Sequence, residues 1–283
     1  MSDVAQFRAP LVARSGNQVN RQKTASLGAA GTISTAVSEN IAPKIAGELS
    51  ALDLLERLAT IRSLFSGRIV FTTSFGLEDQ TIAHAIFVQA LAIDVATLDT
   101  GRLFPETHEV WAETERRYGT RILAFAPEHA SVEALIARQG INGLRSSVAA
   151  RLDCCAVRKV APLARVLDGC AAWITGIRGD QSVDRAHLSL VSFDEQHHLI
   201  KVNPLFDWTR EQTADFIHTH QVPYNLLHDR GFLSIGCAPC TRAVAPGEPE
   251  RAGRWWWEQA EQKECGLHIA PDGRATRASL SSA

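Results

Sequence analysis

The sequence predicts an α/β protein built around a parallel β-sheet. From about residue 68 onward, short segments rich in β-branched residues alternate with longer segments of helical periodicity. Small and polar residues follow the expected strands. With 45% hydrophobic side chains among 283 residues, the chain can also form a substantial core. Because neighbouring parallel strands need crossovers, the alternation predicts right-handed βαβ units.

The individual elements follow in chain order. Leucine and isoleucine spacing between Leu49 and Ile61 predicts one amphipathic helix, from about residue 44 to about Gly67. Strands are expected at 68–73, 95–98, 122–125 and 171–175, with two more within 187–202. Helices are expected at 78–92, 105–118, 132–139, 157–167 and 210–220. Pro105 should open its helix, and Thr209 is a candidate cap for the last one.

The charge balance excludes some classes of partner. Twenty-nine Lys and Arg oppose 31 Asp and Glu, so a net charge of −2 gives no global basic field for nucleic acid or an anionic membrane. The sequence lacks a run of about 18 apolar residues, and its six cysteines are too few for a disulfide scaffold. We therefore expect a soluble, cytoplasmic protein, for which a homo-oligomer is possible.

The chain divides into three expected parts. Residues 1–43 are expected to be a flexible N-terminal extension, because they are polar and irregular. Residues 44–245 should form one α/β domain, since no linker rich in Gly, Pro or Ser interrupts them. Residues 246–283 form a C-terminal segment with a cysteine of its own.

Loops after strands are the expected ligand sites of such a sheet, because helix N-termini there present N–H groups to anions. In the loop after the first strand, Ser74 offers a hydroxyl and Gly76 a close backbone approach, although an ordinary turn also has these residues. Arg178 follows a later strand, where its guanidinium either pairs with phosphate or sulfate or is simply solvated.

The cysteines form a recognisable set. Adjacent Cys154 and Cys155 are followed 82 positions later by Cys237 and Cys240 in a CxxC pair. Four thiolates suit an iron–sulfur cluster or zinc, and a redox CxxC with two core thiols is a further alternative. Cys170 lies beside an apolar strand and is interpreted as a core residue.

The end of the chain carries a separate candidate for chemistry. Cys265 stands beside a glycine in the sequence ECGLH, where His268 could stabilise its thiolate. Upstream, Arg251 and Arg254 lie three residues apart in RAGRWWWE and are available for an anion.

Taken together, these motifs resemble the assimilatory adenylyl-sulfate and 3'-phosphoadenylyl-sulfate reductases, specifically their cluster-containing bacterial type. The resemblance extends from about residue 68 to 268 and includes SFGLED, DTGRLFPET, CCAVRK, GIRGDQS, the CxxC segment, RAGRWWWE and ECGLH. It implies a Rossmann-like fold of the adenine-nucleotide alpha-hydrolase, or pyrophosphate-loop, type.

The resemblance also implies roles for individual residues. A 4Fe-4S cluster would be held by the four paired cysteines, Cys154, Cys155, Cys237 and Cys240, and Cys265 would be the nucleophile. The substrate-binding residues would be Thr73, Ser74, Gly76, Lys159, Arg178, Arg251, Arg254 and His268. Members commonly carry two consecutive arginines where this chain has Arg178 and Gly179, and Arg185 is a candidate substitute.

The implied reaction is the reduction of adenylyl sulfate to sulfite and AMP through a cysteine S-sulfonate, with thioredoxin as electron donor. Only 18 residues follow Cys265, too few for a fused thioredoxin-like domain. The alternative is the same reaction on 3'-phosphoadenylyl sulfate, for which the cluster cysteines are usually absent. A more remote alternative is a zinc-stabilised pyrophosphate-loop protein that thiolates tRNA.

Overall fold

The computed structural model describes residues 35–182 and 185–258. Six strands form one sheet in the order β3-β2-β1-β4-β6-β5, with β1 (Arg68–Thr73) and β4 (Cys170–Ile174) side by side near its centre. The remaining strands are β2 (Asp94–Leu98), β3 (Leu123–Phe125), β5 (Val191–Asp194) and β6 (Leu199–Val202). All neighbours are parallel except β5 and β6, which are antiparallel. The predicted α/β class and its mainly parallel sheet are confirmed.

The strand order locates the expected ligand site. From β1 the chain moves to β2 and β3 on one side of the sheet and later to β4 and β6 on the other. In open α/β sheets, ligands bind at the carboxyl ends of the strands where the order reverses. The carboxyl ends of β1 and β4 are therefore the place to look.

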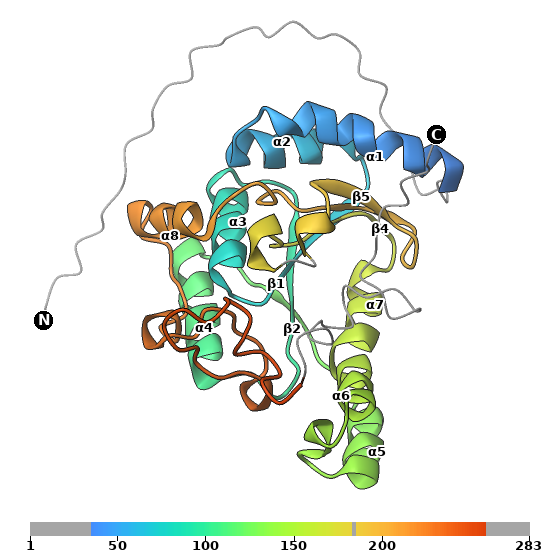
Figure 1. Ribbon diagram of the computed structural model, residues 1–283. Helices are drawn as coiled ribbons and strands as arrows, with labels where there is room; N and C mark the ends of the chain where they lie inside the picture. Colours follow the sequence, from blue (N-terminus) through green and yellow to red (C-terminus); the bar gives the residue numbers. More distant parts are fainter. Residues whose placement is uncertain (1–34, 183–184, 259–283) are drawn as a thin grey trace, which may run out of the picture.

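The two faces of the sheet have separate cores, which follow from the alternation of side chains along β1. Ile69 and Phe71 pack with the helices α1 (Thr35–Ser50), α2 (Leu54–Leu64) and α3 (Leu77–Val88). Val70 faces the opposite side and packs with Trp173 and with α7 (Ala161–Leu167). Figure 1 shows α1 and α2 across one side of the sheet and α5 (His129–Gln139), α6 (Val148–Cys155) and α7 in a column on another.

The first expected helix is two helices, α1 and α2. Asp53 begins α2 with a capping box, since its carboxylate accepts from the N–H of Glu56 while the Glu56 carboxylate accepts from the N–H of Asp53. The expected domain boundary at residue 44 lies inside α1, where Ala42 and Ile45 are both buried in the core. The N-terminal part of the domain thus begins before the position that the sequence suggested.

The other helices differ from expectation mainly at their ends. The helix predicted at 78–92 is the shorter α3, whereas α4 (Pro105–Tyr118) has the predicted bounds. Thr209 caps α8 (Arg210–Thr219) as expected. The helix predicted at 157–167 is longer, because α6 and a π-helical turn at Ala156–Val160 precede α7 without a break. No helix in the described ranges is long and apolar enough to span a membrane.

Candidate functional site

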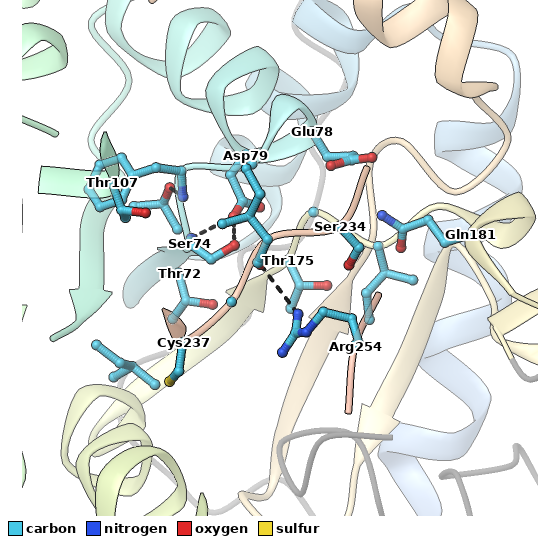
Figure 2. Close-up of a pocket in the computed structure, with 18 of the residues that line it drawn as sticks. Thr72, Ser74, Glu78, Asp79, Thr107, Thr175, Gln181, Ser234, Cys237 and Arg254 are labelled. Atoms are coloured by element: carbon cyan, nitrogen blue, oxygen red, sulfur yellow. Dashed lines mark hydrogen bonds between the residues drawn. The ribbon is translucent and has the colours of Figure 1, made fainter. Parts of the chain in front are cut away.

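A large pocket lies at the carboxyl ends of the central strands, and we call it the strand-end pocket. Its floor is formed by the ends of β1 and β2 and by Thr175, the residue after β4. The loop residue Ser74 lines it, together with Ser234 and Gln181 from later segments (Figure 2). Gly76 lines it too. The structure therefore brings Thr73, Ser74 and Gly76, all expected at the site, to one cavity.

The loop after β1 is held by a buried carboxylate. Asp79, in the first turn of α3, accepts hydrogen bonds from the Ser74 backbone N–H at 2.5 Å and from the Ser74 hydroxyl at 2.8 Å (Figure 2). Burial raises the pKa of Asp79 to about 6, and the Ser74 hydrogen bonds limit this rise. The left-handed residue of the loop is Phe75, with φ of 62°, whereas Gly76 has an ordinary φ of −71°.

Cationic side chains surround the same pocket. Lys159 comes from the π-helical turn, Arg185 from the segment after β4, and Arg251 and Arg254 from residues 250–258, which we call the arginine segment. Arg254 is 6% exposed, donates to the Ile235 carbonyl at 3.3 Å and lies over the Trp255 ring. Such a group of cations suits an anionic ligand.

Arg178 has an environment different from the expected one. Its side chain is fully buried and does not line the strand-end pocket. Its guanidinium donates to Glu78 at 2.7 Å, to Glu250 at 2.9 and 3.1 Å, and to Asp180. Contrary to the expectation from the sequence, Arg178 therefore contacts three carboxylates of the protein, while the candidate substitute Arg185 lines the pocket.

A second, smaller pocket adjoins the first and is lined by the four paired cysteines, so we call it the cysteine pocket. Cys154 and Cys155 end α6, and Cys237 and Cys240 lie in the loop that precedes the arginine segment. Burial raises the pKa of Cys154, and that of Cys240 to about 11. The wall also contains the cations Arg102, Arg151, Arg158 and Lys159, which would offset the negative charge of cysteines that ionise to bind a metal.

The donor chemistry fits a four-thiolate metal centre, because soft sulfur ligands converge on one partly apolar cavity. Within residues 35–182 and 185–258, however, no three His, Cys, Asp or Glu side chains form a ready metal-binding group. The structure thus shows that the two cysteine pairs meet in one pocket.

Lys159 connects the two cavities. It lines both the strand-end pocket and the cysteine pocket, as do Cys237 and Trp255. The π-helical turn that carries Lys159 follows directly after Cys155, and such turns often occur at functional sites. Its neighbour Arg158 is buried and donates to the Thr100 carbonyl at 2.7 Å, which fixes the turn against the loop after β2.

Three further pocket residues, Glu78, Asp79 and His228, were not predicted as site residues. Glu78 and Asp79 belong to the SFGLED motif and line the pocket. The sequence does not predict them there, because a carboxylate is not expected beside an anionic ligand. His228 also lines the pocket, and neither ring nitrogen has a hydrogen-bond partner among the described residues. Burial lowers its pKa to about 4, so the ring is neutral near pH 7 and can donate and accept. Cys265 and His268 lie outside the described residues.

Comparison with known families decides the relationship of this chain. Residues 68–243 match the model of the phosphoadenosine phosphosulfate reductase domain, which covers both halves of the sheet and both cysteine pairs. The chain belongs to this family. Its matched region ends just before the arginine segment, which therefore lies outside the family model.

Curated relatives and a solved structure agree with the assignment. Adenosine 5'-phosphosulfate reductase of Agrobacterium fabrum is 53% identical over 78% of this chain and 85% of its own length. The protein of the same name from Allochromatium vinosum is 50% identical, again over 78% of this chain and 85% of its own length. The crystal structure of phosphoadenylyl-sulfate reductase from Candida auris in a phosphate complex has a TM-score of 0.63 and 25% identity, and it covers 77% of this chain and 100% of that one.

Proposed function

We propose that this protein reduces adenylyl sulfate to sulfite and AMP in sulfate assimilation, in the cytoplasm and with thioredoxin as electron donor. The observation that carries the proposal is that Lys159 lines both the strand-end pocket and the cysteine pocket. The relatives named adenosine 5'-phosphosulfate reductase, at about half identity over most of the chain, support adenylyl sulfate as substrate. They favour neither the 3'-phosphorylated substrate nor the tRNA-thiolating alternative.

In this proposal the pocket binds the nucleotide by its anionic groups. The loop after β1, with Ser74 and Gly76, lines the pocket at the start of α3, where the helix N-terminus favours an anion. Lys159, Arg185, Arg251 and Arg254 offset the negative charge of the phosphosulfate. Because these cations reduce the repulsion between a thiolate and an anionic sulfuryl group, they lower the barrier to attack on sulfur.

The chemistry proceeds in two steps. The Cys265 thiolate attacks the sulfur atom, an S–S bond forms, and the bond from sulfur to the bridging oxygen breaks, so that AMP leaves with the electron pair. A thiolate of thioredoxin then attacks the Cys265 sulfur and releases sulfite, and its second thiol resolves the mixed disulfide. The dithiol supplies both electrons, and thioredoxin leaves as a disulfide.

Cys265 can reach the pocket from the described part of the chain. It follows Glu258 by seven residues, and a fully extended chain of that length spans at most about 25 Å. Trp255, three residues before Glu258, already lines both pockets. His268 is proposed to lie near the thiolate during attack.

We propose that the four paired cysteines hold a 4Fe-4S cluster, because four thiols and several cations line their common pocket. When bound, such a cluster supplies a fixed local charge next to Lys159.

The deciding experiment compares wild-type protein with Cys265→Ser. After incubation with adenylyl sulfate but no reductant, wild-type protein should carry one sulfonate-sized adduct on Cys265 by mass spectrometry. Cys265→Ser should bind the nucleotide equally well but form no adduct and no sulfite, since a serine hydroxyl is a poor nucleophile near neutral pH. Wild-type turnover without an adduct would disprove the two-step mechanism.

A further inference from the structure

The arginine segment, residues 250–258, has an acidic residue at each end. Glu250 precedes Arg251 directly, and Glu258 follows Trp257. Both carboxylates are nearly buried, with 14% and 3% of their side chains exposed. A buried carboxylate needs a partner, so each end of the segment should be fixed by a cation.

Arg178 fixes the first end. Two hydrogen bonds from its Nη2 reach the Glu250 carboxylate, at 2.9 and 3.1 Å. From the same guanidinium, Nε donates to Glu78 in the first turn of α3. Burial raises the pKa of Glu78, but the charge and hydrogen bond of Arg178, together with a backbone hydrogen bond, lower it below its ordinary value. One arginine thus joins the helix after the β1 loop to the arginine segment.

Arg151 fixes the second end. Its Nε and Nη2 each donate to one oxygen of Glu258 at 2.9 Å, and 1% of the Arg151 side chain is exposed. The guanidinium also lies 4.7 Å from the centre of the Trp255 ring. Because Arg151 belongs to α6, which ends in Cys154 and Cys155, this contact joins the segment to the helix of the first cysteine pair.

The middle of the segment pairs with the loop of the second cysteine pair. The N–H of Trp255 donates to the Cys240 carbonyl at 3.0 Å, and the N–H of Arg242 donates to the Gly253 carbonyl at 3.0 Å. Thr241 and Arg254 form an antiparallel bridge. Arg251 and Arg254 therefore lie on a stretch of backbone that an ion pair fixes at each end.

We propose that Arg178 and Arg151 are positioning residues, which clamp the arginine segment at its two ends and hold Arg251 and Arg254 at the strand-end pocket. The identity of the ligand rests on the proposed function, whereas the clamp itself does not. A guanidinium suits the task because its planar fork bonds several carboxylate oxygens at once, which a compact ammonium cannot do.

The direction in which Glu250→Gln changes nucleotide affinity distinguishes a positioning role of Glu250 from simple charge repulsion. Glu250 lines the strand-end pocket, so its negative charge repels an anionic nucleotide. If repulsion were its whole effect, Glu250→Gln would tighten nucleotide binding. If Glu250 anchors Arg251 and Arg254, the same change loosens the segment and weakens binding.

The experiment measures adenylyl sulfate binding by calorimetry in the full-length, non-reacting Cys265→Ser protein. Glu250→Gln, Glu258→Gln and Arg178→Lys should each raise the dissociation constant about tenfold, as expected for a displaced charged contact. In an Arg254→Ala background, Glu250→Gln should raise the dissociation constant much less, because one of the arginines that Glu250 positions is already absent. In the reactive protein, KM should rise more than kcat falls.

A matched control is the neighbouring pair of Glu248 and Arg242, which is partly exposed and does not line either pocket. Glu248→Gln should leave the dissociation constant unchanged. Tighter binding by Glu250→Gln, or an equal loss in the Arg254→Ala background, would overturn the clamp.

Hydrogen exchange without ligand gives a test that is independent of the substrate. The amide of Trp255 should exchange faster in Glu250→Gln and Glu258→Gln than in the parent protein, while amides of the central strands do not change. Unchanged exchange at Trp255 would contradict the clamp. If exchange rises as expected but the parent protein does not bind adenylyl sulfate, the proposed function fails and the clamp stands.

Discussion

Gly236 lies directly against the guanidinium of Arg254. A Cβ atom at position 236 would stand 2.3 Å from Nη2 and 2.5 Å from Cζ of Arg254. These distances are too short for any real contact, so a side chain at 236 must displace the guanidinium. The absence of a side chain at Gly236 is therefore part of how Arg254 is held at the strand-end pocket.

Gly236→Ala should weaken nucleotide binding without unfolding the protein. The obstructed atoms are the end of a long side chain, which can turn away at little cost in stability. We expect KM for adenylyl sulfate to rise about tenfold, close to the effect of Arg254→Ala, with a melting temperature within about 2 °C of the parent. The double variant should be no worse than Arg254→Ala alone, and additive losses would show that Gly236 acts on something else.

The sequence predicts elements well where local pattern decides them. The strand at 68–73 alternates between two buried faces, and the helix at 105–118 has proline at its start and glycine after its end. Both have the predicted bounds because their signals lie within a few residues. The break between α1 and α2 was missed, although Asp53 and Glu56 form a readable capping box, because the leucine pattern runs across it.

The site was predictable in its residue types and less so in its contacts. The motif order predicts roles for the cysteine pairs and Lys159, and the structure places these residues together in the lining of the cysteine pocket. The contacts of Arg178 could not be predicted, because its partners Glu78 and Glu250 are 100 and 72 residues away in the sequence. Whether an arginine after a strand meets a ligand or a carboxylate is decided by tertiary contacts, which no local pattern contains.

The proposed cluster can be tested by replacing with serine one proposed ligand cysteine and one cysteine outside the cysteine pocket. Protein purified anaerobically should contain about four iron and four acid-labile sulfide per chain, as four-cysteine ligation implies. Cys237→Ser should lose most of this iron. Cys170→Ser should keep it, since Cys170 lies at the start of β4 and accepts a hydrogen bond from Arg68 away from the cysteine pocket. Stoichiometric zinc, or equal iron loss in both variants, would refute the assignment.

Gly179 packs closely against Phe206. A Cβ atom there would lie 3.1 Å from Cε2 of Phe206 and 3.2 Å from the Phe206 carbonyl oxygen, so an added side chain requires the Phe206 segment to shift slightly. Gly179→Ala should lower the free energy of unfolding by about 1 kcal/mol while leaving nucleotide affinity nearly unchanged.

Gly47→Ala is the control for this change. Gly47 lies inside α1 with no atom within 4 Å of its added Cβ, so alanine there should raise the free energy of unfolding by up to about 1 kcal/mol. Denaturant titrations of both variants decide the matter, and a stabilising Gly179→Ala would contradict the close packing.

Asp79 should make nucleotide binding depend on pH near 6. Its pKa is raised to about 6 by burial, so the carboxyl is largely ionised at pH 8 and protonated at pH 5. The ionised form repels an anionic ligand in the strand-end pocket, whereas the protonated form does not. Affinity for adenylyl sulfate should therefore increase as pH falls through 6, by about tenfold if the bound anion raises the pKa by one further unit.

The same shift has a consequence for stability, with a definite sign. Since the pKa is higher in the folded protein than its ordinary value of 3.8, the folded state binds the proton more tightly. The contribution of Asp79 to folding stability is then complete below about pH 4 and is lost as pH rises through 6. Asp79→Asn removes this dependence. The free energy of unfolding of the variant minus that of wild type should therefore become more positive from pH 4 to pH 7, because only wild type loses stability from this group.

Calorimetry in the Cys265→Ser protein tests the binding effect without turnover, and both acidic groups of adenylyl sulfate stay ionised between pH 5 and 8. Titrations at pH 6 in buffers of different ionisation enthalpy should show uptake of a fraction of a proton per nucleotide bound. Asp79→Asn should abolish that uptake and flatten the pH profile of the dissociation constant. An Asp79→Asn profile as steep as that of the parent would place the titrating group elsewhere in the pocket.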